Sequence, residues 1–146
     1  AAPAAAAPRD PITPYNARLL ARAKLWAQQR LDVVCLQETY VSRSDEVAAA
    51  AALAEVGREL HGAGWKAYFN SAKHGVAILI RQDLLQSGRL RVLNTVVEEG
   101  DGGRGRLLRV QLQWGGHRMW LLAAYLPSGN YARQRAFIDT FLRPIA

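Results

Sequence analysis

Three polar residues follow stretches that are expected to be extended, at points where the chain turns into a loop or a helix. They are Asn16, Glu38 and Tyr125. Rigid strands aim the side chains at their ends into a cleft, so an amide, a carboxylate and a phenol at such points could bind a ligand or transfer protons. The residue types alone leave a structural alternative for each: Asn16 as a helix cap, Glu38 as a solvated loop residue, and Tyr125 as an aromatic residue at a strand end.

The segments around these residues resemble four sequence blocks of the endonuclease/exonuclease/phosphatase superfamily, the DNase I-like enzymes. The blocks are a first strand that ends in Asn, the family signature, a Gly-Val strand and a Tyr-x-Pro segment, found here at residues 13–19, 31–39, 74–81 and 122–129. They occur in the family's order over nearly the whole chain, and the retrotransposon and abasic-site endonuclease branches look closest. The chain departs from the family at Leu19, where Gly is usual, and at Ser128, where Asn is common.

The resemblance implies a role for each of the three residues. Glu38 would hold Mg²⁺, a hard cation that prefers carboxylate and water oxygens. Asn16 would lie beside that carboxylate and orient it or the phosphate. Tyr125 would place its hydroxyl on a phosphate oxygen. The metal would polarise a phosphodiester and stabilise the leaving oxygen.

The resemblance also implies catalytic groups that the 146 residues do not contain. Members of the superfamily carry a Gly-Asp-x-Asn block and a terminal Asp-His pair after the Tyr-x-Pro helix. Asp139 lies in an apolar helical pattern, and no histidine of the chain follows an aspartate. Each missing element is worth roughly 10² to 10⁴ in rate. We therefore expect that this chain alone does not cut nucleic acid.

The charge balance favours a polyanionic partner. Lys and Arg outnumber Asp and Glu by 19 to 12, which gives a formal net charge of +7. Nucleic acid, RNA or DNA, is the expected partner. The residues that we expect to contact it are Lys73, His74, Arg104, Arg106 and Arg133. The alternative is that His74 is a solvated loop residue and that each arginine lies on a solvent-exposed face without contacting a ligand.

Hydrophobic periodicity predicts the elements that must position these residues. An amphipathic helix of about 13 residues begins at Asn16. Residues 32–36 form a short β-branched apolar run, which is typical of a buried and central strand. The lone cysteine, Cys35, lies in it and is expected to be an inert core thiol. A second helix is expected from about Asp45 to His61.

The rest of the chain reads mainly as strands. They are expected at residues 65–70, 75–80, 89–97, 108–114 and 119–125. Gly115 and Gly116 form a hairpin turn, and Asn130 caps a final helix. We therefore predict a mixed α/β domain over residues 11–146, preceded by a flexible Ala/Pro leader at residues 1–10. No apolar run is long enough to span a membrane.

The resemblance makes this fold the N-terminal half of a DNase I-like α/β sandwich, a mixed, mostly antiparallel sheet flanked by helices. Half of such a sandwich would expose an apolar sheet face larger than a soluble monomer usually tolerates. The residues expected on that face are Val76, Ile78, Ile80, Leu122 and Ala124. A protein partner is expected to cover them.

Two functions of different classes fit these observations. The first is a nuclease-derived, non-catalytic protein that serves as a basic structural subunit of a ribonucleoprotein or another nucleic-acid-containing assembly. The alternative is a fragment of an active Mg²⁺-dependent endonuclease or phosphodiesterase. A phosphatase for small phosphorylated lipids or inositols fits the superfamily but not its closest branches. The sequence leaves the cellular compartment open.

Overall fold

The computed structural model describes residues 14–61, 64–72 and 74–145. The predicted leader at residues 1–10 lies outside this part. The described chain forms two three-stranded antiparallel sheets. The first sheet has the order β1-β3-β2, with the bounds Val33–Gln37, Val76–Arg81 and Trp65–Asn70. The second has the order β4-β5-β6, with the bounds Leu90–Val97, Leu107–Trp114 and His117–Ala124.

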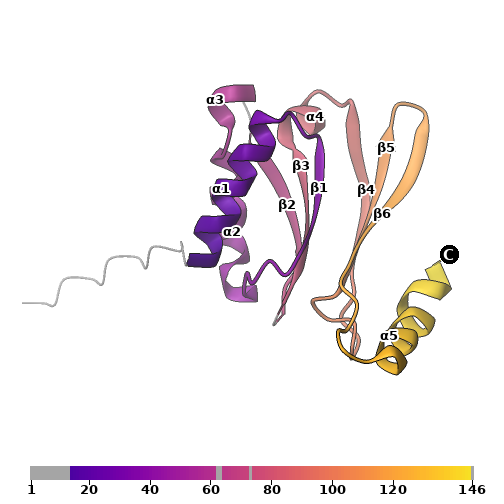
Figure 1. The fold of residues 1–146 in the computed structure, drawn as a ribbon. Coiled ribbons are helices and arrows are strands. Elements are labelled where there is room, and N and C mark those ends of the chain that lie inside the picture. Colours follow the sequence, from indigo (N-terminus) through magenta and orange to yellow (C-terminus); the bar gives the residue numbers. More distant parts are fainter. Residues whose placement is uncertain (1–13, 62–63, 73, 146) are drawn as a thin grey trace, which may run out of the picture.

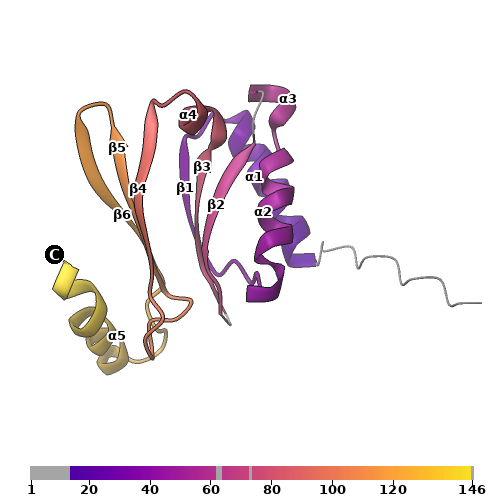
Figure 2. The same cartoon turned by 180° about the vertical axis from the view of Figure 1, so that it is seen from behind.

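The elements stack in three layers, helices on sheet on sheet (Figure 1). The helices over the outer face of the first sheet are α1 (Pro14–Gln28), α2 (Glu46–Glu55) and α3 (Arg58–His61). A short helix, α4 (Gln82–Gln86), joins the two sheets, and α5 (Tyr131–Phe137) follows β6. No helix lies over the middle of the outer face of the second sheet in the described part (Figure 2).

Two apolar clusters hold the layers together. Between the sheets, β3 packs on β5, and Ile78 of β3 and Val110 of β5 are fully buried there. Between α1 and the first sheet, Leu19, Ala23 and Trp65 are buried. The Trp65 indole also donates a hydrogen bond of 3.1 Å to the carbonyl oxygen of Ala23. The mixed α/β class predicted from the sequence is confirmed at this level.

Most predicted elements are present. The strands β2 to β6 lie where periodicity placed them, and Trp114 pairs with His117 across the predicted Gly-Gly hairpin turn. Asn130 caps α5, because its side-chain oxygen accepts a hydrogen bond of 3.2 Å from the backbone N–H of Arg133. In the described part, no helix is long and apolar enough to cross a membrane.

The prediction of a strand that ends at Asn16 is wrong, because the residue lies in the first turn of α1. Pro14 opens this helix, a position where the missing N–H of proline costs nothing. Three residues spaced by four, Leu19, Ala23 and Ala27, are then buried on the first sheet. That burial stabilises the helical conformation through the whole segment.

The prediction that residues 32–36 form a central strand is also wrong. In the described chain β1 pairs only with β3 and is an edge strand, whereas the central strand is β3. All residues from Val76 to Ile80 are fully buried. Cys35 lies on this edge strand, is exposed and is therefore not a core thiol.

The long second helix is interrupted. It ends at Glu55, and α3 begins at Arg58 after Gly57 adopts a left-handed backbone with φ of 77°. A Cβ at Gly57 would lie 2.6 Å from the Cβ of Ala27 on α1, so the close approach of the two helical segments favours glycine at this break.

The prediction of an exposed sheet face is wrong for its three residues on β3 and is confirmed for Leu122 on β6. Val76, Ile78 and Ile80 have no exposed surface, because the second sheet covers them. Ala124 is partly buried. The uncovered surface is the outer face of the second sheet, where Leu122 is 37% exposed.

Candidate functional site

The ends of β1 and β6 bring together two of the predicted site residues. The hydroxyl of Tyr125 donates a hydrogen bond of 2.5 Å to Oε1 of Glu38, across 87 residues of sequence. Next to it, the amide of Gln37 donates a 2.5 Å hydrogen bond to the carbonyl oxygen of Ala124. The two strand ends are thus joined by a side chain on each strand, and the phenol and carboxylate form one polar unit.

The segment that follows β1 has an unusual backbone. Glu38 and Tyr40 have φ angles of 53° and 52°, in the left-handed region that non-glycine residues rarely occupy. Between them Thr39 donates from its backbone N–H to the carbonyl oxygen of Gly75 at 3.2 Å. The N–H of Tyr40 donates to His74 at 2.8 Å. Strain of about 1–3 kcal/mol per residue persists where surrounding contacts fix it, and such positions cluster at functional sites.

A row of three rings lies over this segment. The His74 ring centroid is 6.0 Å from that of Tyr40 and 5.4 Å from that of Tyr125. His74 Nδ1 is buried, and no hydrogen-bond partner for it is found among the described residues. The same holds for the hydroxyls of Thr39 and Ser71 nearby. Buried polar atoms of this kind are normally satisfied by water or a ligand.

Arg106 contacts both the ring and the backbone of Tyr125. Its guanidinium carbon lies 5.0 Å from the Tyr125 ring centroid, within cation–π distance. Its Nη1 donates a 3.1 Å hydrogen bond to the carbonyl oxygen of Tyr125, and the N–H of Tyr125 donates to Arg106 at 2.7 Å. The position of the phenol is therefore fixed from both its backbone and its ring.

A basic hollow of about 400 Å³ lies beside this unit, and we call it the arginine hollow. The side chains that could bind an anion there come from three separate segments of the chain: His74, Arg104, Arg106, Ser128 and Arg133. Four of these five were predicted from the sequence as contacts to nucleic acid. The fifth predicted residue, Lys73, lies outside the described residues.

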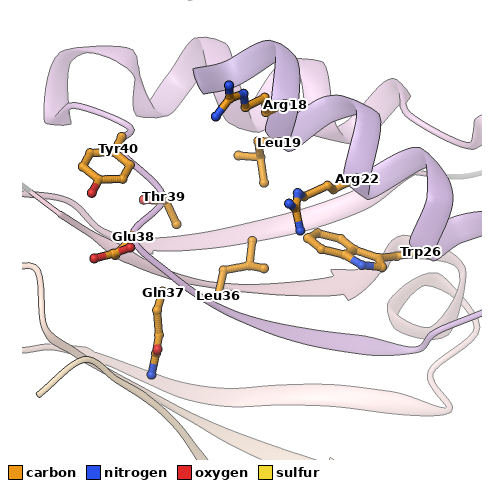
Figure 3. Close-up of a pocket in the computed structure, with 9 residues that line it drawn as sticks. All are labelled: Arg18, Leu19, Arg22, Trp26, Leu36, Gln37, Glu38, Thr39 and Tyr40. Atoms are coloured by element: carbon orange, nitrogen blue, oxygen red, sulfur yellow. The ribbon is translucent and has the colours of Figure 1, made fainter. Parts of the chain in front are cut away.

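Glu38 lines a second hollow of about 350 Å³, which we call the helix pocket (Figure 3). Arg18, Arg22 and Trp26 line it from α1, and residues 36–40 form its floor. Figure 3 shows both arginines reaching from the helix over this segment. Both arginines are exposed, and their i,i+4 spacing puts them on the same face of the helix. The side chain of Asn16, one turn earlier, is outside the described part.

Asn70 is a buried polar residue that sequence reasoning missed. Its side-chain nitrogen donates to the carbonyl oxygens of Glu98 and Leu107 at 3.0 and 2.7 Å. Its side-chain oxygen accepts from the N–H of Gly105 at 2.9 Å. These bonds fix both ends of the loop that carries Arg104 into the arginine hollow. A polar residue ending a strand was the available signal.

The pKa of Tyr125 is raised above its ordinary value. The hydrogen bond to Glu38 is the main cause, since losing the phenol proton would destroy it, and partial burial and the nearby carboxylate charge add to the effect. The positive charge of Arg106 acts in the opposite direction. Tyr125 is thus a proton donor at neutral pH.

Glu38 can supply one oxygen ligand to a cation. Among the described residues there is no group of three His, Cys, Asp or Glu side chains that could hold a metal. Mg²⁺ is often held by one or two carboxylates, with water and substrate phosphate oxygens completing its shell. The donor set therefore fits Mg²⁺ only as a shared site, in which Glu38 provides a carboxylate and a bound phosphate provides further oxygens.

Comparison of the chain with protein-family models and with curated proteins found no significant match.

Proposed function

We propose that the chain is a nucleic-acid-binding protein with the half-fold of a DNase I-like α/β sandwich, and that it serves as a basic structural subunit of an RNA- or DNA-containing assembly. The observation that carries the proposal is the Tyr125–Glu38 hydrogen bond at the rim of the arginine hollow. In our interpretation this site binds the phosphodiester backbone.

The chemistry of the arginine hollow suits a phosphodiester. Guanidinium groups bind phosphate oxygens through paired N–H donors. Arg104 and Arg106 come from the loop before β5 and Arg133 comes from α5, so they can approach one anion from two sides. The Tyr125 hydroxyl lies at the edge of this group. Mg²⁺ bound to Glu38 would add positive charge for a second phosphate oxygen.

A binding role also agrees with the protonation of the site. A catalytic base must accept a proton from water, whereas Tyr125 stays protonated and its hydroxyl donates a hydrogen bond to Glu38. The three arginines are the donors that can hold an anion, beside a phenol that stays protonated. This donor set supports retention of a phosphate more directly than its hydrolysis.

Sedimentation of the native protein tests the structural role. Extract from its source is run on a sucrose gradient, with and without RNase or DNase, and the protein is followed by immunoblot. We expect it to migrate with a large particle and to shift to small fractions after one of the two nucleases. Migration as a small free protein in untreated extract would contradict the structural role.

The second candidate is a Mg²⁺-dependent phosphodiesterase, and the strained backbone at Glu38 is the observation that favours it. Nicking of supercoiled DNA and cleavage of labelled RNA are measured with Mg²⁺ and with EDTA. Activity that needs Mg²⁺, is lost in Glu38→Ala and persists in Glu59→Ala, an exposed glutamate on α3, would establish this function in place of the first.

A further inference from the structure

The outer face of the second sheet is a basic surface distinct from the Glu38–Tyr125 site. The strands β4, β5 and β6 carry no Asp or Glu in their 24 residues, yet each carries an arginine. Their apolar partners, such as Leu108 and Val110, point between the sheets. Because side chains alternate along a strand, Arg91, Arg109 and Arg118 share the outer face.

The register arranges this face in rows around one tryptophan. Trp120 lies opposite Gln111 and is 44% exposed. The row on one side contains Arg91 and Arg118, which both pair with Gln113 of β5. The row on the other side contains Arg109, whose guanidinium carbon is 5.8 Å from the Trp120 ring centroid. Successive rows on one face are about 6.8 Å apart.

We propose that this face binds single-stranded nucleic acid, with one base stacked on Trp120 and the flanking arginines on phosphates. An exposed aromatic ring between cations is the arrangement by which sheet surfaces bind unpaired bases. Charge complementarity favours nucleic acid over an apolar protein segment, because such a segment would bury three guanidinium groups without a counter-charge. The inference deepens the proposed function by naming an unpaired strand as the ligand.

Fluorescence anisotropy with a 5′-labelled 12-nucleotide RNA tests the proposal. Stacking on an aromatic side chain is worth about 5- to 150-fold in affinity, so Trp120→Ala should weaken binding by that factor. Trp120→Phe keeps a stacking ring and should stay within about threefold of the native protein. The matched control is Tyr131→Ala, which removes an aromatic ring that is 77% exposed on α5.

Two further ligands separate stacking from charge. Trp120→Ala should leave binding unchanged for the same 12-mer in duplex form and for an abasic 12-mer, because neither offers an unpaired base. An unaltered affinity of Trp120→Ala for the single strand, or an equal loss on all three ligands, would overturn the proposal, and the latter would indicate a structural defect. Should Trp120→Ala fail to fold, quenching of native tryptophan fluorescence by the 12-mer decides: it must be smaller in Trp120→Phe than in the native protein, and equal quenching would overturn the proposal.

Phosphate binding at the arginine hollow and base stacking on Trp120 can be tested separately. Replacing Arg104 and Arg133 by Gln weakens phosphate binding at the arginine hollow but leaves Trp120 in place. The effect of Trp120→Ala on the single strand should persist in that background. If the hollow variants bind normally while Trp120→Ala does not, the proposed function of the hollow fails and the sheet-face proposal stands.

Discussion

At the scale of single residues, Tyr125 and Glu38 act as one unit. The phenol proton lies between two oxygens 2.5 Å apart, and Arg106 fixes the ring and the backbone on the other side. A hydrogen bond to an ionised acceptor is about twice as strong as a neutral one. The charge of Glu38 should therefore control the acidity of Tyr125.

Glu38→Gln should lower the pKa of Tyr125 toward the ordinary tyrosine value, because the amide is a weaker, uncharged acceptor. Since the folded pKa exceeds the unfolded one, this bond stabilises the fold fully below about pH 10 and less as the pH rises through the folded pKa. Tyrosinate absorbance at 295 nm measures the titration, and Tyr125→Phe identifies the responsible ring. An unchanged titration in Glu38→Gln would show that the bond does not set this pKa.

Asn70→Ala should lower the free energy of unfolding by about 2–4 kcal/mol, because it removes three side-chain hydrogen bonds to backbone groups, two of which are buried. Urea denaturation followed by circular dichroism measures the change. The matched control is Asn94→Ala at an exposed position, where the expected change is within about 0.5 kcal/mol. Equal stability of the two variants would contradict the anchoring role of Asn70.

The sequence predicted only part of the site. Glu38 and Tyr125 were predicted because they end segments that resemble known blocks, and the structure brings them into contact. Arg18 and Arg22 were missed, because only the packing of α1 on the first sheet decides which helix face overlooks Glu38. Asn70 was missed because the polar end of a strand looks the same whether it is solvated or buried.

At the scale of elements, the open edge of β1 has the most direct chemical consequence. Cys35 on this strand is exposed, while partial burial raises the pKa of its thiol above the ordinary value. The thiolate is the reactive form. The thiol should therefore be accessible but slow to react near neutral pH.

Without denaturant, Cys35 should react fully with Ellman's reagent, at a rate below that of a cysteine-containing peptide at pH 8. The rate should rise about tenfold per pH unit until the pH passes the raised pKa. Absorbance at 412 nm measures the reaction. If the thiol reacts only after urea is added, Cys35 is a core residue, as the sequence alone had suggested.

Periodicity predicted the strands β2 to β6 because alternation and apolar runs are local signals. It could not tell the edge strand β1 from the central strand β3, since both are short apolar runs. Which strands pair with each other is decided by contacts between residues distant in sequence, such as the pairing of Val34 with Leu79. For the same reason Ile78 was expected on an exposed face, whereas the second sheet buries it.

At the scale of the whole molecule, positive charge is gathered on two surfaces. One is the arginine hollow beside Glu38, and the other is the outer face of the second sheet. A net charge of +7 supports non-specific attraction to nucleic acid, whereas binding at the arginine hollow depends on particular arginines. The salt dependence of binding can separate these two possibilities.

The most direct test of the central claim is the slope of binding affinity against salt concentration for a single-stranded RNA. We compare the native protein with a variant in which Arg104, Arg106 and Arg133 are all replaced by Gln. The control removes three exposed charges elsewhere, through Lys24→Gln, Arg30→Asn and Arg58→Gln. Asparagine suits position 30 because the backbone there is left-handed, with φ of 58°.

On logarithmic axes, the slope should become shallower by about 0.7 for each arginine that contacts a phosphate, while the control should keep the native slope. Circular dichroism confirms that both variants are folded. Equal slopes for the two variants, at any overall affinity, would contradict phosphate binding at the Glu38–Tyr125 site.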